Sequence, residues 1–210
     1  IAAASLGIKK IKVTGGEPLA RKSCPQLVKM LKNIPGIEKV TLTTNGVQLA
    51  QYLDQLLDAG LDAVNISLDT VDPVLYEKIT GRDKLSEVMK VIEKAEDLPV
   101  PVKINAVSID FRQLQTGGKT AGLSPQENWQ QVAELAKRYP VDVRFIEMMP
   151  MCDSSGFGPE AYIPFTRVLE ALPEAVPAAK DGGVAKLFHL PGALGNIGLI
   201  SPVSAHFCGE

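Results

Sequence analysis

The stretch KKIKVTGGEP, residues 9–18, reads as a β-strand that ends in a tight turn. Gly15 and Gly16 let backbone groups turn outward and approach a ligand closely, which a Cβ would obstruct. Glu17 adds a negative charge, and Pro18 restricts the exit of the turn. Such a strand end could hold a small polar ligand that carries a positively charged amine. The alternative is a helix-entry turn with an exposed glutamate.

Strand-like and helix-like patterns alternate outward from this stretch. Strands are predicted at residues 9–14, 39–43, 63–68, 102–107 and 141–147, and helices at 25–33, 50–59, 73–80, 85–96 and 125–138. Asp72 and Ser124, each directly before a proline, are predicted N-caps, and Ser23 lies two residues before Pro25. Repeated β-α units predict parallel strands with helical crossovers, as in part of an α/β barrel or an open doubly wound sheet.

The alternation stops after Glu147. Residues 148–164 are irregular, residues 165–171 could form a short helix, and residues 173–195 are rich in proline, glycine and alanine. One more strand is expected from Asn196, and residues 111–123 are expected to form an extended loop. We therefore expect a barrel core over residues 1–150 and a C-terminal extension over residues 151–210.

Composition and charge exclude several classes of protein. The chain has 210 residues, 45% hydrophobic and 22% charged, which is typical of a soluble globular protein with one sizeable domain. A net charge of −2 gives no global basic field, so we expect neither a nucleic-acid partner nor a membrane surface. No apolar run approaches the roughly 20 residues of a membrane span, and no charged-then-apolar pattern predicts a signal peptide in these residues. A cytoplasmic location is the default.

The ends and the cysteines suggest an internal fragment of a longer protein. The chain opens at Ile1 in a helix-like run and ends at Glu210, two residues after Cys208. Cys24, Cys152 and Cys208 stand far apart, so no zinc or iron–sulfur site is complete in this sequence. Their odd, scattered number also argues against a secreted disulfide framework.

Polar residues recur where the predicted strands end. The ends read TGGE (residues 14–17), TTNG (43–46), SLD (67–69) and EMM (147–149), and the fourth strand carries Lys103 and Asn105. Parallel strands place their carboxyl ends on one face, where ligands bind in barrels and in open α/β sheets. Each residue alone has a structural explanation, but together they predict a ligand site.

Further motifs follow the GGEP turn in order: LTTNG (42–46), VNISLDTVDP (64–73), ITGRD (79–83), RFIEMMP (144–150) and ISPVSAHFCG (200–209). The turn resembles the S-adenosylmethionine (SAM) motif of radical SAM enzymes, and the whole series resembles the molybdenum cofactor biosynthesis protein A family, the GTP 3',8-cyclases. The resemblance covers nearly the whole chain. It implies an α/β fold, a partial (incomplete) TIM-like (β/α)6 radical SAM barrel with an irregular C-terminal extension.

The resemblance also implies ligand positions. The SAM-binding positions are Gly15, Gly16, Glu17, Ser67 and Met149, and the Glu17 carboxylate would suit the SAM amino group. The GTP-binding positions are Lys12, Thr43 and Lys103. Many family members have arginine where Lys12 stands, so the charge is kept but the bidentate fork is lost. The resemblance implies no catalytic residue in this chain.

The family uses two [4Fe-4S] clusters, and the chain completes neither. The cysteine triplet of the SAM-cleaving cluster is missing from this sequence. Cys208 matches the first ligand of the second cluster, which lies in the truncated end of the extension, and one thiolate cannot hold four irons. Cys24 and Cys152 match no family ligand. We therefore expect the chain as it stands to be inactive.

For the parent protein, the resemblance implies a radical SAM lyase that acts on GTP through a 5'-deoxyadenosyl radical. Its product is the cyclic intermediate on the way to cyclic pyranopterin monophosphate in molybdenum cofactor biosynthesis. The implied partners are GTP and SAM as ligands, a second copy in a homodimer, and a downstream pterin-forming enzyme. The alternatives are another radical SAM enzyme, a metal-free aldolase with Lys103 as Schiff-base nucleophile, and a SAM- or nucleotide-binding remnant without catalysis.

Overall fold

The computed structural model describes residues 2–111, 123–149, 162–179 and 183–202. The chain forms two compact units. Unit 1 comprises Ile1–Ser67 and Lys84–Ile104, and unit 2 comprises Leu68–Asp83 and Asn105–Glu210. The central part of the predicted loop at 111–123, together with Cys152 and Cys208, lies outside the described residues.

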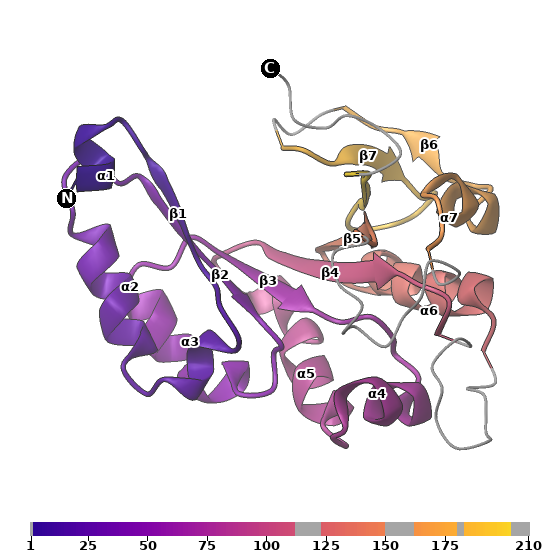
Figure 1. Cartoon of the computed structure of the whole chain (residues 1–210), viewed down its shortest axis with the longest axis horizontal. Helices are drawn as coiled ribbons and strands as arrows, with labels where there is room; N and C mark the ends of the chain where they lie inside the picture. The colour runs from indigo at the N-terminus through magenta and orange to yellow at the C-terminus, as the bar shows by residue number, and fades with distance from the viewer. Residues whose placement is uncertain (1, 112–122, 150–161, 180–182, 203–210) are drawn as a thin grey trace. The chain divides into compact units, whose positions relative to one another are not determined.

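Unit 1 is a parallel sheet with helices packed on it (Figure 1). Its strands are β1 (Lys10–Val13), β2 (Lys39–Thr44), β3 (Ala63–Ser67) and the start of β4 (Val102–Ser108). Its helices are α1 (Ala2–Ser5), α2 (Cys24–Lys32), α3 (Leu49–Asp58) and α5 (Leu85–Ile92), with 3₁₀ turns η1 (Pro18–Ala20) and η2 (Ala95–Asp97). Both β1 and β3 pair with β2 in parallel, and α3 packs against α2 and α5.

The two faces of this sheet differ in character. Along β2, Val40, Leu42 and Thr44 are buried, whereas the residues between them are only partly buried. Helix α5 packs close to the buried face, because a Cβ placed on Gly46 would meet Ile66 Cγ2 and a Val88 methyl group at 3.0 Å. The opposite face is therefore the one that presents polar side chains.

Unit 2 contains the rest of β4 and the strands β5 (Val141–Glu147), β6 (Val176–Pro177), β7 (Lys186–His189) and β8 (Ile197–Ile200). Strand β8 pairs in parallel with β5, while β7 runs antiparallel to β8 and β6 antiparallel to β7. Its helices are α4 (Pro73–Thr80), α6 (Pro125–Arg138) and α7 (Thr166–Ala171), and α6 packs against β5 and α7. The order of hydrogen-bonded strands is β1-β2-β3-β4 in unit 1 and β4-β5-β8-β7-β6 in unit 2.

The predicted helix starts are confirmed. Asp72 caps α4 by accepting the Leu75 N–H at 2.7 Å. Ser124 and Glu127 form a capping box at α6, in which each side chain accepts the other residue's backbone N–H. Ser23 occupies the N-cap of α2 but makes no side-chain capping bond.

The α/β class and the mostly parallel sheet are confirmed, with two local differences. The helix predicted at residues 85–96 ends at Ile92 and is followed by the separate 3₁₀ turn η2, a common way for a last turn to tighten. The region predicted to be irregular at residues 173–195 contains β6 and β7, which are too short to show a period of two. None of the described helices is long and apolar enough to cross a bilayer.

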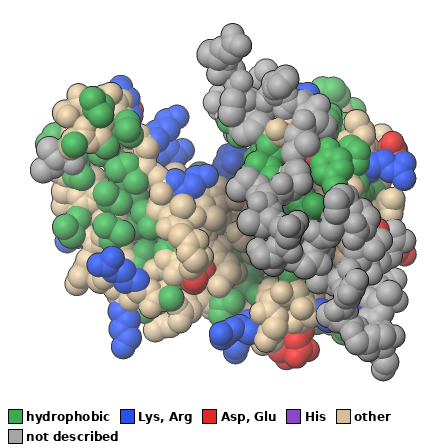
Figure 2. Space-filling view, viewed as in Figure 1, with side chains coloured by type: hydrophobic (Ala, Val, Ile, Leu, Met, Phe, Trp, Pro, Cys, Tyr) green, Lys and Arg blue, Asp and Glu red, His purple; other side chains and the backbone are tan. Residues whose placement is uncertain are grey.

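Large apolar side chains remain exposed on both units. Leu6, Ile8 and Met30 are exposed on unit 1, and Val184 and Leu194 on unit 2. Figure 2 shows apolar side chains gathered over the helices of unit 1, with lysine and arginine side chains distributed between them. Exposed apolar residues of this kind are normal on a globular surface.

Candidate functional site

The turn after β1 leaves open space above its two glycines. Gly15 has a φ of 149°, which side-chain-bearing residues rarely adopt, so its backbone conformation favours glycine. A Cβ placed on Gly15 or Gly16 would meet no atom within 4 Å. The space that a side chain would fill is therefore free for a ligand that approaches the backbone.

The Glu17 carboxylate is held by three protein donors. Its Oε1 accepts the Leu19 N–H at 3.0 Å and the Thr44 hydroxyl at 2.7 Å, and its Oε2 accepts the Asn45 N–H at 2.7 Å. Glu17 is thus the N-cap of η1 and also a link to the end of β2. The alternative of a helix-entry turn is confirmed, but that of an exposed glutamate is wrong, because Glu17 is half-buried between its donors. A carboxylate offers about four acceptor positions, so roughly one is left for a ligand.

Ser67 lies at the same level of the sheet as this link. Thr44 is level with Ile66 in the β2–β3 register, so the next residues, Asn45 and Ser67, follow at the same height. Ser67 is exposed at the end of β3. The structure therefore brings the predicted SAM positions Gly15, Gly16, Glu17 and Ser67 to the carboxyl end of one sheet.

The predicted GTP positions share one face of the same sheet. Thr43 is level with Asn65, and the bond from the Val64 N–H to the Pro101 carbonyl makes Asn65 level with Lys103. Lys12 is level with Thr41, two residues before Thr43 in β2, and so it lies on the same face. Lys12 is exposed, and Lys103 is half-buried.

The Thr43 hydroxyl oxygen is buried without a hydrogen-bond partner. An unsatisfied buried hydroxyl costs about 1–3 kcal/mol, so such groups in folded proteins need an explanation. A ligand atom that completes this hydrogen bond is one explanation, and it fits the predicted role of Thr43.

Met149 belongs to unit 2 and follows the end of β5. Its side chain is 50% exposed, so it is available to a ligand. Two residues earlier, Glu147 is buried and accepts the Tyr162 hydroxyl at 2.8 Å. The roles given to Met149 and to the residues of unit 1 stay predictions.

The part of the chain that the structure describes contains no group of three His, Cys, Asp or Glu residues that could hold a metal ion. Cys24 begins α2, and its thiol is buried. Burial raises the pKa of this thiol, and the nearby Glu17 charge raises it further. The described residues therefore do not fit an iron–sulfur cluster. Cys208 lies outside them.

The sequence places Asp69 and Thr44 among the polar strand ends but assigns neither an individual role, and both make specific contacts. Asp69 Oδ1 accepts the Val107 N–H at 2.8 Å, and the Asp69 carbonyl accepts the Asn128 amide at 2.8 Å. Burial raises the pKa of the Asp69 carboxyl, against the lowering effect of the Val107 bond. For Thr44 the sequence did contain a signal. Two adjacent threonines in a strand must face opposite sides, so one of Thr43 and Thr44 was bound to place its hydroxyl on the buried side.

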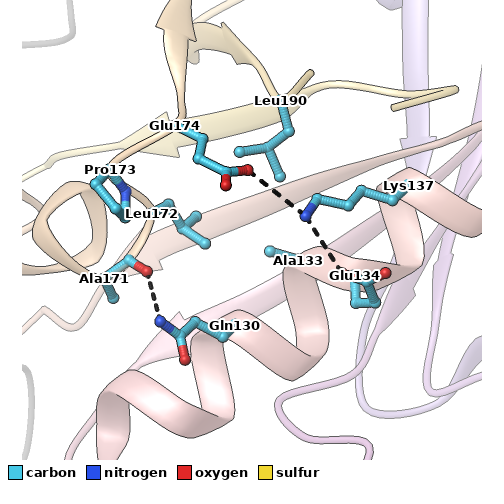
Figure 3. Close-up of a pocket in the computed structure, with 9 residues that line it drawn as sticks. All are labelled: Gln130, Ala133, Glu134, Lys137, Ala171, Leu172, Pro173, Glu174 and Leu190. Carbon is cyan, nitrogen blue, oxygen red and sulfur yellow. Dashed lines mark hydrogen bonds and ion pairs between the residues drawn. The ribbon is translucent and has the colours of Figure 1, made fainter. Parts of the chain in front are cut away.

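A cavity of about 280 Å³ lies elsewhere, in unit 2 (Figure 3). Its lining comes from α6, from the end of α7 and from Leu190. Lys137 crosses it, 3.6 Å from a Glu134 carboxylate oxygen and 3.8 Å from one of Glu174. None of the predicted site residues lines this cavity, so it is not the predicted ligand site.

Comparisons with known proteins place most of the chain in two family models. Residues 1–114 match the family model of the Radical SAM superfamily, and residues 141–210 match that of Molybdenum Cofactor Synthesis C. The chain is 40% identical to the GTP 3',8-cyclase of Alkaliphilus metalliredigens and 37% identical to that of Alkaliphilus oremlandii. These alignments cover 96% and 100% of this chain but 60% and 62% of the relatives, so the chain spans about three fifths of their length.

Among solved structures, the chain is similar to a domain of the pyruvate-formate lyase-activating enzyme from Bacteroides vulgatus. The TM-score is 0.55 at 13% identity, over 79% of this chain and 94% of that domain. At this identity the likeness concerns the fold alone. It agrees with the predicted partial TIM-like barrel.

Proposed function

The chain belongs to the radical SAM superfamily, and from this we propose that it carries the SAM- and GTP-binding strands of a GTP 3',8-cyclase. The superfamily implies SAM and an iron–sulfur cluster as cofactors. The more specific activity rests on the GTP 3',8-cyclases that the chain resembles along nearly its whole length. Because the chain spans about three fifths of those proteins, the reaction is proposed for the longer protein.

One observation carries the proposal: two predicted sets of ligand positions meet on the sheet of unit 1. The positions Lys12, Thr43 and Lys103 share one face, and the Gly15–Gly16 turn opens at its carboxyl end. The chain has a net charge of −2, so it attracts no anion as a whole. The two local lysines, Lys12 and Lys103, suffice to hold one.

Each group has a role in binding. The ammonium groups of Lys12 and Lys103 offset the triphosphate charge, and lysine is a common phosphate ligand. The Thr43 hydroxyl completes its missing hydrogen bond on the nucleotide. Backbone groups of the turn and the remaining acceptor position of Glu17 hold the amino-acid part of SAM, with Ser67 beside them. SAM supplies the hydrogen-abstracting chemistry, and the protein orients the substrates and excludes water.

The finer parts of the proposal concern residues beyond unit 1. Met149 is assigned to SAM, and Cys208 to a second [4Fe-4S] cluster that other cysteines of the longer protein complete. A homodimer and a downstream pterin-forming enzyme are the proposed partners.

A chimera tests the activity. This chain replaces the matching segment of the GTP 3',8-cyclase from Alkaliphilus metalliredigens, with which it aligns over 204 residues. We expect the reconstituted chimera to form 5'-deoxyadenosine and a cyclised nucleotide in a GTP-dependent reaction. A chimera that folds, holds its clusters and binds SAM but leaves GTP unchanged would contradict the proposal.

Lys103→Met in the chimera tests the nucleotide site. Loss of a charged phosphate contact costs about 1.5–3 kcal/mol, so kcat/KM for GTP should fall about tenfold or more. Lys29→Met is the matched control, since Lys29 lies in the last turn of α2 and is exposed. Equal effects of the two substitutions would remove Lys103 from the site.

A further inference from the structure

The Thr44 side chain is buried in unit 1, and its hydroxyl makes two hydrogen bonds. It is 2% exposed, donates to Glu17 Oε1 at 2.7 Å and accepts the Gly46 N–H at 3.1 Å. The hydroxyl thus lies between the turn after β2 and the carboxylate of the turn after β1. Each of its polar functions has a partner.

Packing alone does not explain a hydroxyl at this position. Thr44 points to the same side of β2 as Val40 and Leu42, which are fully buried and apolar. Valine has nearly the shape of threonine and would fill the same space without burying a polar atom. The carboxylate of Glu17 is the feature that calls for a donor here.

The Glu17 carboxylate in turn fixes the position of the glycine turn. Its bonds to Thr44 and Asn45 span 27 and 28 residues of sequence, so they join two separate strand ends. Gly15 and Gly16 come directly before Glu17 and have no side chains of their own to anchor them. The β1–β2 ladder ends at Val13 and Leu42, so beyond it this carboxylate helps to hold the turn in position relative to β2.

We propose that Thr44 is a positioning residue for the SAM site, which acts through Glu17 to hold the Gly15–Gly16 turn against the end of β2. This inference rests on the proposed function, because it assigns the turn to SAM. Thr44 itself touches no ligand. Glu17 then has two functions, since it anchors the turn through three acceptor positions and offers the remaining one to the SAM amino group.

Amide hydrogen exchange and SAM titration of the 210-residue chain test the proposal. Thr44→Val removes the donor and keeps the shape, and one lost hydrogen bond of about 1.4 kcal/mol corresponds to a tenfold change. We expect about tenfold faster exchange at Leu19 and Asn45 and about tenfold weaker SAM binding. Thr44→Ser, which keeps the hydroxyl, should restore both.

Thr41→Val is the matched control, in the same strand. The Thr41 side chain is half-buried and has no hydrogen-bond partner within the described residues. This substitution should leave the exchange at Leu19 and Asn45 and the SAM affinity within twofold of the parent chain. If Thr44→Val fails to fold, Glu17→Gln keeps the shape and should speed exchange at the same two amides.

The outcomes separate this inference from the proposed function. Unchanged exchange at Leu19 and Asn45 in Thr44→Val overturns the positioning role, and so does a uniform acceleration across β2 and β3, which marks a general loss of stability. Faster local exchange with unchanged SAM affinity also overturns it and leaves the proposed function standing. If the parent chain binds no SAM, the assignment of the turn to SAM is wrong, and this inference is overturned with it. The exchange data would still report whether Thr44 anchors the turn.

Discussion

A carboxylate is hydrogen-bonded to each end of strand β2. The two carboxylates differ in whether a cationic side chain pairs with their negative charge. At the start, Asp62 accepts the Val40 N–H at 2.6 Å and pairs with Lys32 Nζ at 2.9 Å. Beyond the end, Glu17 accepts the Asn45 N–H and the Thr44 hydroxyl, and none of its described partners is cationic. The charge of Asp62 is met by Lys32 within the protein, whereas the charge of Glu17 meets no cation among its described hydrogen-bond partners, as its proposed binding of the SAM amino group requires. The difference separates a structural attachment from one that we propose also binds a ligand.

The attachment at the start of β2 is reinforced by further contacts of Lys32. Lys32 donates to the Glu38 carbonyl at 3.0 Å as well as to Asp62. Its stem lies under Gly60, where an added Cβ would meet Lys32 Cγ at 3.3 Å. No predicted ligand position lies among these residues.

The largest effect is expected for Asp62→Ala. This change leaves the buried Val40 N–H without an acceptor and Lys32 without its partner, at a cost of about 2 kcal/mol in the free energy of unfolding. Chemical denaturation measures the loss, and SAM and GTP affinities of the folded chain should not change. Glu38→Ala, which removes an exposed ion pair with Lys9, is the control and should cost much less. Equal losses in both variants would erase the distinction between the ends of β2.

Asp69 is a third carboxylate that accepts a backbone N–H, after Asp62 and Glu17. Because its pKa is raised, its ionisation lowers the free energy of unfolding. A folded-state pKa above the unfolded value of about 3.9 means that stability falls as pH rises from about 4 through the folded pKa. Asp69→Asn keeps an oxygen for the Val107 N–H and removes the charge. We expect the variant to be at least as stable as the parent chain at pH 7, with the difference shrinking near pH 4. Urea unfolding at both pH values measures it, and a clear loss at pH 7 would show that the carboxylate stabilises the fold.

Cys24 reports on the charge of Glu17. Because burial first and Glu17 second raise the pKa of its thiol, Cys24 should react at less than about a tenth of the rate of an exposed thiol. A chain with Cys152→Ser and Cys208→Ser isolates this thiol for alkylation kinetics. Adding Glu17→Gln should speed the reaction slightly, since burial remains. An unchanged alkylation rate in the Glu17→Gln variant would mean that the charge of Glu17 is already neutralised in the parent chain.

The smallest effect is expected for the exposed pair Lys84–Glu87. Hydrogen bonds from Lys84 and Ser86 lower the pKa of Glu87 to about 2. Lys84→Met should raise this pKa towards the usual value near 4.3, as an NMR titration would show, with little change in stability at pH 7. Stability from the pair is present above the unfolded pKa of about 4.3 and is lost as pH falls from there through the folded pKa of about 2. A large loss of stability at pH 7 would show that solvent does not screen such pairs in this protein.

The sequence predicted most of the regular fold because its signals are local. The strand at 141–147 and the helices at 73–80 and 125–138 match the structure to the residue, with Pro73 and Pro125 at the helix starts. Strands β6 and β7 could not be predicted in this way. Their pairing with each other and with β8 depends on contacts distant in sequence.

In the candidate site, too, features that depend on local sequence were predicted, and features that depend on contacts distant in sequence were not. Polar strand ends predicted that Gly15, Thr43 and Ser67 lie at one end of a sheet, because parallel strands share a direction. The bonds of Glu17 could not be predicted, since they join residues 27 and 28 positions apart. Burial of the Thr43 hydroxyl without a partner likewise needs the three-dimensional neighbours.

Gly46 limits how chains of this kind can diverge. Its φ of 81° already disfavours any side chain, and even one methyl group would press on Ile66 and Val88 at 3.0 Å. Evolution cannot leave glycine here by a single amino-acid replacement without disturbing the contact between β3 and α5. Homologues that carry another residue at this position should show compensating, smaller residues at the positions of Ile66 and Val88.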